Sequence, residues 1–295
     1  MVRFKIVLIT IIFFTVINSA NSQQSSYPVF NWDDEPKWDD LTHWRFHDFR
    51  PFIEGSYGSG IPRHKLFKGD FERYGALEIR LGYSHIVNYQ DFVLEMDEHY
   101  LFGNFSNQKQ DWFDSETEVE KVRTEITRFG FGNRTGFGYK LAFLSILPYH
   151  QNHLSLCKLT SERPLNLMPK DVEILERYEG SLRFGVSTEG GLKVEIFRSL
   201  SIIGGYETAI VYPRLVFFRW LGGLIIESAI IEGISRFAKD IVDHSSILGP
   251  LFYAVLRNGA AYGVYIGTRD KMYWPFNSET PLSQETFKVA LAITF

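Results

Sequence analysis

The sequence of 295 residues contains only one cysteine, Cys157, so no intramolecular disulfide can form. A small secreted domain held together by disulfides is therefore excluded, and stability must come from packing and backbone hydrogen bonds. Basic residues are not in excess, since the formal net charge is −4, and this argues against nucleic acid as a partner. The G-x-S-x-G, P-loop and dinucleotide-binding motifs are also absent, so the sequence offers no support for the activities that depend on them.

The first 22 residues have the pattern of a secretory signal peptide. Arg3 and Lys5 precede the apolar run Ile6–Ile17, which is too short for an ordinary membrane-spanning helix. The small-x-small triplet Ala20–Ser22 then predicts cleavage before Gln23. An uncleaved anchor is the alternative. We expect an exported mature chain of about 270 residues, long enough for one large all-β domain or two small ones.

Residues 23–50 are predicted to form an extended acidic arm. Its acidic residues cluster around Pro36, and its tryptophans recur every six residues. The acidic residues are Asp33, Asp34, Glu35, Asp39 and Asp40, and the tryptophans are Trp32, Trp38 and Trp44. Acidic clusters can hold Ca²⁺, but the arm lacks the ordered spacing of a calcium-binding loop. We therefore interpret these residues as a solvated acidic surface.

Several segments alternate between apolar and polar residues, as strands with two different faces do. The alternation within residues 77–84 sets Leu77, Ile79, Leu81 and Tyr83 against Glu78, Arg80, Gly82 and Ser84. Further strands are expected at Phe52–Gly58, Phe92–Phe105 and Ser201–Tyr212. The charges of such a strand would face the lumen of a membrane barrel or the water around a soluble sandwich, so alternation alone does not separate these two folds.

Glycine-rich segments predict two β-hairpins. The first lies within residues 126–145, with its turn near Asn133 and Gly136, and the second turns at Thr188–Gly191. Leu147–Val172 contains three prolines and is predicted to be a loop rather than a central strand.

Residues 214–244 interrupt the β pattern with apolar residues at helical spacing, and a second helix is predicted from Ile247 to about Ile266. Arg219 and Glu227 make the first segment too charged for a confident spanning helix. Four placements fit this insert: a plug in a lumen, a cover at a barrel mouth, a position in the membrane interface, or the core of a soluble α+β domain. The first two predict that Phe218, Leu221 and Ile225 are buried, with Arg219 and Glu227 on water or a partner.

Two groups of residues were weighed as chemical sites. His150, His153 and Cys157 offer three soft-metal donors, but a fourth ligand at motif spacing is missing. Asp243–Ser246 sets an acid, a base and hydroxyls side by side, although neighbours in sequence rarely form a triad in space. We interpret the first group as surface or loop residues and the second as a helix terminus. The sequence therefore predicts no catalytic, cofactor-binding or metal-binding residues and no cofactor.

The segment Phe287–Phe295 places a large apolar residue at every odd position and ends on an aromatic residue. Its length is about that of a tilted strand that crosses a bilayer. In this arrangement it resembles the C-terminal assembly signal of bacterial outer-membrane β-barrel proteins, a class-level resemblance that covers one strand and agrees with the signal peptide. The resemblance implies a bacterial outer-membrane location, with membrane lipid and the barrel assembly machinery as partners.

The preferred fold is mainly β: an antiparallel transmembrane β-barrel of about 8–12 strands over residues 51–295, with a helical insert at about 214–266. Its lumen side is expected to carry Glu78, Arg80, Arg183, Lys193 and Glu195. The expected role is structural, or the passage or binding of a small molecule, without enzyme activity. The alternatives are an exported soluble or peripheral α+β protein that binds lipid, in the periplasm or secreted, and a barrel enzyme that acts on lipids.

Overall fold

The computed structural model describes residues 49–108 and 121–295. The predicted signal peptide and nearly all of the acidic arm lie outside the described residues. Residues His47–Phe295 form one compact unit, and the description below concerns this unit alone.

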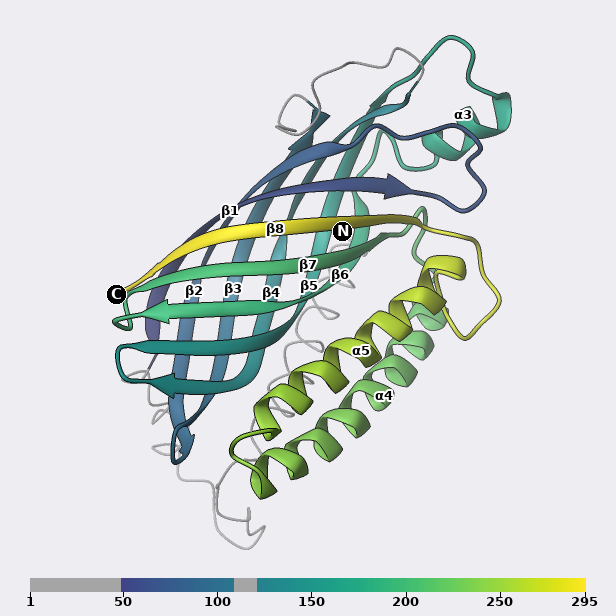
Figure 1. Ribbon diagram of the computed structural model, residues 1–295. Helices are drawn as coiled ribbons and strands as arrows, with labels where there is room; N and C mark the ends of the chain where they lie inside the picture. The colour runs from purple at the N-terminus through teal and green to yellow at the C-terminus, as the bar shows by residue number, and fades with distance from the viewer. Residues whose placement is uncertain (1–48, 109–120) are drawn as a thin grey trace, which may run out of the picture. The chain divides into compact units, whose positions relative to one another are not determined.

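The described residues build an eight-stranded antiparallel barrel that closes on itself (Figure 1). Its strands are β1 (Arg50–Arg63), β2 (Tyr74–Gln90), β3 (Val93–Asn107), β4 (Arg123–Leu141), β5 (Leu144–Glu162), β6 (Arg183–Ile196), β7 (Leu200–Val211) and β8 (Leu282–Thr294). Leu291 of β8 lies opposite both Ile202 of β7 and Gly55 of β1, so the last strand closes the ring. The prediction of a mainly β antiparallel barrel with a helical insert before the last strand is confirmed.

The two predicted hairpins are wrong, because each segment is a single strand. β4 runs straight through Asn133 and Gly136, and β6 runs straight through Thr188–Gly191. The actual turns are short and contain no glycine. Asp91 and Ala142 adopt positive φ angles of 39° and 48° in the turns that follow β2 and β4. These backbone angles suit tight hairpins; aspartate is common at such positions, whereas alanine is not.

The predicted loop Leu147–Val172 is also largely wrong, because its first part belongs to β5. Pro148 has no backbone N–H, so it cannot donate a hydrogen bond to the neighbouring strand, although a central strand is hydrogen-bonded on both sides. Pairing between β4 and β5 is interrupted at this point, between the pairs Thr135–His150 and Tyr139–Ile146. The interruption lets the barrel accept a proline inside a central strand.

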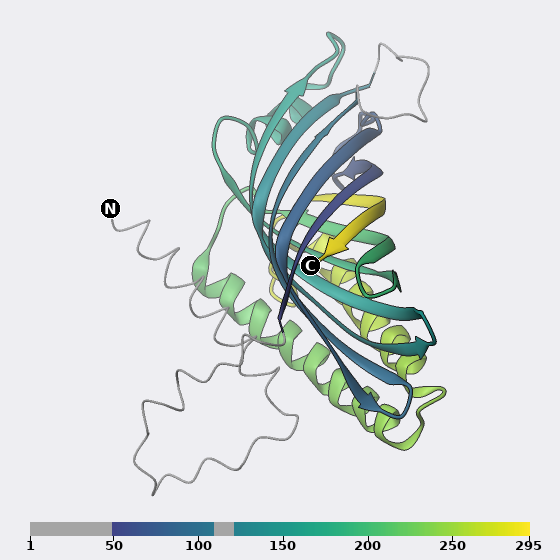
Figure 2. The same ribbon diagram turned by 90° about the vertical axis from the view of Figure 1, so that its left-hand side faces the viewer.

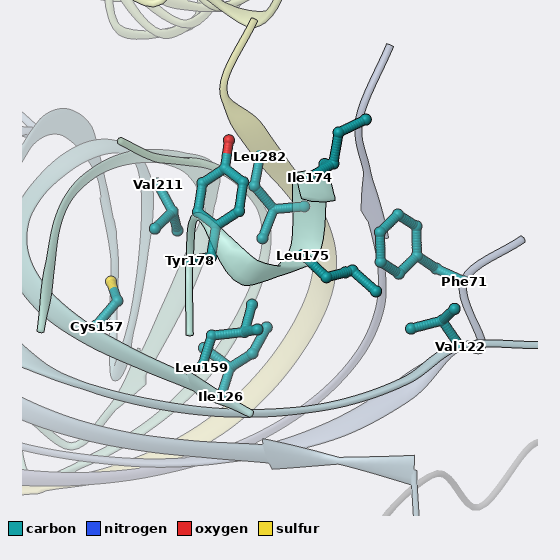
Figure 3. Close-up of a cluster of buried hydrophobic side chains, with 10 residues drawn as sticks. All are labelled: Phe71, Val122, Ile126, Cys157, Leu159, Ile174, Leu175, Tyr178, Val211 and Leu282. Atoms are coloured by element: carbon teal, nitrogen blue, oxygen red, sulfur yellow. The ribbon is translucent and has the colours of Figure 1, made fainter. Parts of the chain in front are cut away.

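The two ends of the barrel differ. Short turns join β2 to β3, β4 to β5 and β6 to β7 at one end, which we call the short-turn end. The opposite end carries the longer connections and the helix α3 (Pro169–Glu176), and we call it the α3 end. Figure 3 shows Ile174, Leu175 and Tyr178 of the α3 segment packed over apolar side chains at this end. The strand-side members of this cluster are Ile126, Cys157, Leu159, Val211 and Leu282. The α3 segment therefore covers one mouth of the barrel.

The helical insert forms a hairpin of α4 (Phe217–His244) and α5 (Gly249–Asp270). Figures 1 and 2 show both helices beside the strands rather than inside the ring, and α5 packs on β4–β7. The expectation for a plug or mouth cover is therefore wrong: Phe218 and Ile225 are exposed, whereas Glu227 is largely buried and accepts a hydrogen bond from Thr268. Among the described residues, no helix combines the length and the apolar character needed to cross a membrane.

Candidate functional site: the charged interior and the apolar outer surface

Charged side chains fill the interior of the barrel, where six carboxylates face five cations and all are buried. The carboxylates belong to Glu54, Glu78, Glu98, Glu189, Glu195 and Glu207, and the cations to Arg80, Arg128, Arg134, Lys193 and Lys288. They project inward because alternate residues of a strand point to the same face. The predicted lumen residues Glu78, Arg80, Lys193 and Glu195 are among them. Arg183 is only half-buried and lies nearer the α3 end.

Arg80 and Arg134 connect strands that are distant around the ring. Both guanidinium groups donate to Glu54 Oε1, from Arg80 Nη1 at 2.8 Å and from Arg134 Nη2 at 3.0 Å. Arg80 also donates to Glu189 Oε2 at 3.0 Å, and Arg134 to Glu98 Oε2 at 2.8 Å. Because these partners come from β1, β2, β3, β4 and β6, the pairs brace the barrel across its interior.

A second set of ion pairs lies closer to the α3 end. Arg128 binds Glu207 through two hydrogen bonds of 2.8 and 3.1 Å. Lys288 of β8 lies 2.6 Å from Glu207 Oε2 and 3.0 Å from Glu78 Oε2. Ion pairs therefore connect the last strand to β2 and β7, in addition to its backbone pairing with β1 and β7. Buried ions need such complete pairing, because an unpaired one would be strongly destabilising.

Aromatic rings complete the packing of the interior. The guanidinium carbon of Arg134 lies 4.8 Å from the ring centre of Tyr149, and that of Arg80 lies 5.2 Å from the ring centre of Tyr100. Both distances suit cation–π contacts. An eight-stranded barrel is just wide enough for side chains to fill it. The interior is thus a packed polar core rather than an open channel.

Glycines on β4 provide the space for these large side chains. Gly130, Gly132, Gly136 and Gly138 share the inward register of Arg128 and Arg134, while the intervening aromatic residues point outward. A Cβ atom added at Gly132 would lie 2.6 Å from Cδ2 of His153 and 2.7 Å from the carbonyl oxygen of Asn152. The glycine-rich pattern therefore reflects the interior packing and not a turn.

Replacing Gly132 with valine is expected to destabilise the barrel by about 1–3 kcal/mol, because the interior has no room for the added atoms. Gly103→Val is the matched control, since a Cβ at this outward glycine of β3 meets no atom within 4 Å. Denaturant unfolding of both variants in detergent micelles measures the difference. Equal stability of the two variants would contradict the close packing described at Gly132.

The α3 end contains a small pocket of about 110 Å³, lined in part by His64, Lys170, Arg177 and Tyr178. Burial lowers the pKa of His64 below its ordinary value. Its two ring nitrogens are both engaged, since Leu66 N–H donates to Nδ1 at 3.3 Å and Nε2 lies 3.2 Å from the carbonyl oxygen of Thr280. The ring is therefore neutral, with its proton on Nε2. A pocket of this size is below the range of about 300–1,000 Å³ that is typical of ligand sites.

The outer surface of the strands is markedly apolar. A belt of large aliphatic and aromatic side chains, each 46–66% exposed, covers the outward positions of β1, β2 and β8 and extends onto β3, β4 and β7. It consists of Ile53, Leu77, Ile79, Leu81, Leu101, Phe129, Ile202, Phe287, Val289, Leu291 and Ile293. In the barrel's register Ile53 lies opposite both Leu81 and Ile293, so the belt is continuous across these strands. Patches of this extent mark an interaction surface.

The three donors considered for a metal do not come together, and their interpretation as surface or loop residues is wrong, because all three are buried in β5. His150 points outward and lies 2.9 Å from Asn258 of α5, whereas His153 points inward and lies 2.6 Å from the hydroxyl of Tyr100. Cys157 is buried on the inward side. A spacing of three residues along a strand puts two side chains on opposite faces. Within residues 49–108 and 121–295, no group of three or more His, Cys, Asp or Glu side chains is arranged to hold a metal ion.

The Asp243–Ser246 segment ends α4, in agreement with its interpretation as a helix terminus. The hydroxyl of Tyr89 donates to Asp243, and His244 Nδ1 lies 2.7 Å from the carbonyl oxygen of Asp240. Leu248 N–H donates to Ser245 Oγ at 3.3 Å. These side chains therefore stabilise the end of α4 and the turn that connects it to α5.

The sequence analysis missed most of the interior network. The missed charges are Glu54, Glu98, Arg128, Arg134, Glu189, Glu207 and Lys288. A usable signal was the even spacing of Arg128, Gly130, Gly132 and Arg134, which places two cations and two glycines on one face of a strand. The pairing between distant strands has no such signal.

No protein-family model matches the sequence, and no curated protein is significantly similar to it. Among solved structures, the chain is similar to Neisserial surface protein A (NspA), with 8% identity, a TM-score of 0.37, and coverage of 83% of this chain and 97% of that one. It is also similar to Ail, the attachment invasion locus protein of Yersinia pestis, with 8% identity, a TM-score of 0.33, and coverage of 84% and 99%. A structure of Ail with the heparin analogue sucrose octasulfate gives the same values. The assignment of this chain as a closed eight-stranded barrel rests on its own strand pairing.

Proposed function

We propose that this protein is an integral β-barrel protein of a bacterial outer membrane, with β1–β8 crossing the bilayer. The observation that carries the proposal is the continuous apolar belt on the outside of a closed barrel whose inside is charged. This is the reverse of a soluble barrel, and it is the distribution that a bilayer requires. Closure adds to the argument, because each strand pairs with a neighbour on both sides and the sheet has no open edge in the hydrocarbon.

The filled interior favours a structural or surface-binding role over the passage of a small molecule. Arg80, Arg134 and Glu54 occupy the centre of the barrel and hold one another in place. The same filling argues against the soluble lipid-binding alternative, since such a protein needs an apolar cavity. The exposed outward residues Phe287, Val289, Leu291 and Ile293 of β8 suit recognition by the barrel assembly machinery, the partner implied by the resemblance of this strand.

Membrane fractionation and gel migration test this proposal. The protein is expected in the outer-membrane fraction, resistant to extraction with alkaline carbonate, and shifted on an SDS gel only after boiling. A closed barrel without free sheet edges is expected to resist SDS at room temperature, which is the reason for the shift. Release of the full-length protein by osmotic shock, together with identical migration before and after boiling, would refute an outer-membrane barrel.

A further inference from the structure

The outer face of the barrel is not uniformly apolar. A strip of polar side chains crosses the outer face from β4 to β8. Its members on neighbouring strands lie opposite one another in the register, and its two members on β5 contact each other. We call this the polar strip, and it consists of Asn133, His150, Asn152, Thr188, Thr208 and Glu285. On β1, β2 and β8 the belt residues Ile53, Leu81 and Ile293 occupy mutually opposed outward positions. A bilayer directly against the strip would meet polar groups that hydrocarbon cannot satisfy.

Helix α5 lies over much of this strip. The side-chain oxygen of Asn258 lies 2.9 Å from Nδ1 of His150, and the side-chain nitrogen of Asn258 donates to the backbone carbonyl of Tyr149 at 3.0 Å. Further along the helix, Tyr265 donates to Glu285 Oε1 at 3.0 Å. His150 and Thr208 are consequently only 2% and 4% exposed, although both point out of the barrel. The helix supplies hydrogen-bond partners that lipid could not.

The opposite face of the hairpin is largely apolar, although it also carries the exposed ion pair of Arg236 with Glu232. Its exposed side chains include Phe218, Ile225, Phe237, Leu251, Val255 and Ile266. Two carboxylates lie near the middle of α4: that of Glu227 points between the helices to Thr268, and that of Glu232 pairs with Arg236. Other charged residues of α4 lie toward the short-turn end, where Lys239 lies 3.9 Å from Glu95. In α5, Arg257 near the middle donates to the hydroxyl of Tyr253, and Arg269 near the α3 end lies 3.3 Å from Glu285. These charges are thus paired or hydrogen-bonded, and apolar side chains make up most of the outer face.

We infer that the α4–α5 hairpin lies within the bilayer, where it shields the polar strip and contacts lipid hydrocarbon through its outer face. The inference rests on the proposed outer-membrane location. The lipid-contacting surface of the protein is then built from two kinds of structure: strands on the side of β8, β1 and β2, and helices on the side of β4–β7. The hairpin makes a barrel with a partly polar outside compatible with a membrane.

Quenching in proteoliposomes tests the inference. Single cysteines replace Ile225 and Val255 on the hairpin, Leu291 on the belt, and Leu165 in the β5–β6 connection, each in a Cys157→Ser background and labelled with bimane. The probes are phosphatidylcholine with brominated acyl chains and aqueous iodide. Bimane at Ile225 and Val255 is expected to be quenched by brominated lipid several-fold more than bimane at Leu165, and to the same degree as bimane at Leu291.

The outcomes separate the inference from the function on which it rests. Iodide quenching at Ile225 and Val255, with lipid quenching kept at Leu291, would overturn the hairpin inference and leave the barrel in the membrane. Protection of both hairpin sites from both quenchers would also overturn it, because a protein partner would then cover this face. Loss of lipid quenching at Leu291 itself would reject the outer-membrane function.

Discussion

Replacing Arg134 with methionine is expected to lower the free energy of unfolding by about 3–5 kcal/mol, because removal of one member of a buried ion network leaves charge without compensation. The Arg134 side chain is 0% exposed and donates to Glu54, Glu98 and Gln151. Six buried carboxylates would then face four cations in a space that excludes water. Denaturant titration of the folded protein in detergent micelles measures the change.

Arg236→Met is the control for this experiment. Arg236 is exposed on α4 and pairs with Glu232 one turn away, so its loss is expected to change stability by less than about 1 kcal/mol. Adding Glu54→Gln to Arg134→Met restores the charge balance, and the double variant should lose less stability than the two single variants together. If Arg134→Met unfolds at the same denaturant concentration as Arg236→Met, the interior network does not stabilise the barrel.

Placing arginine at Leu291 is expected to reduce the stability of the membrane-inserted protein by about 2–4 kcal/mol, because a charge on the lipid face near the bilayer midplane is costly. Leu291 lies between the outward residues Val289 and Ile293 of β8 and is 59% exposed on the outside of the barrel. The neighbouring residues Ala290 and Ala292 point inward into a buried apolar cluster, so they provide no partner for the charge of the new arginine. Urea titration of folding into phospholipid vesicles gives the free-energy difference.

Leu165→Arg provides the comparison, because Leu165 is fully exposed in the β5–β6 connection and should accept the charge without loss. In a soluble protein Leu291→Arg would replace an exposed apolar residue with a charged one, and stability would hardly change. Equal folding of the two variants into vesicles would therefore speak against lipid contact at β8.

The strands that sequence alone predicted are those whose two faces differ in polarity. The segments 77–84 of β2 and 287–294 of β8 alternate, and their outward and inward residues lie as expected. β4 and β6 were misread because glycine was taken as turn chemistry, whereas Gly132 is small to make room for an inward neighbour. Of the real turns, that at Ala142 carries no turn-forming residue, and Asp91 is not followed by the glycine of a typical hairpin turn. Glycines that the sequence pattern assigns to turns thus lie within strands, where their small size permits close interior packing.

The interior pairing and the position of the hairpin were beyond sequence reasoning for a different reason. Arg80 reaches Glu189 only because the ring closes and brings β2 and β6 to opposite sides of one narrow space. The stretch Val216–Ile231 is apolar around nearly its whole circumference, so no single face indicates what it packs against. Both features depend on the closed barrel and not on any local pattern.

The long excursion between β7 and β8 governs the order in which the barrel can be completed. Residues 212–281 separate Val211 from Leu282, and β8 must pair with β7 on one side and with β1 on the other. Until β8 arrives, a sheet of seven strands has two free edges, each a template for pairing with another chain. The hairpin precedes β8 in the chain and packs on β4–β7, so it contacts the edge strand β7 but not the edge strand β1. We expect closure by β8 to be a late step of folding, and its failure would leave a helix-covered sheet open to edge-to-edge association.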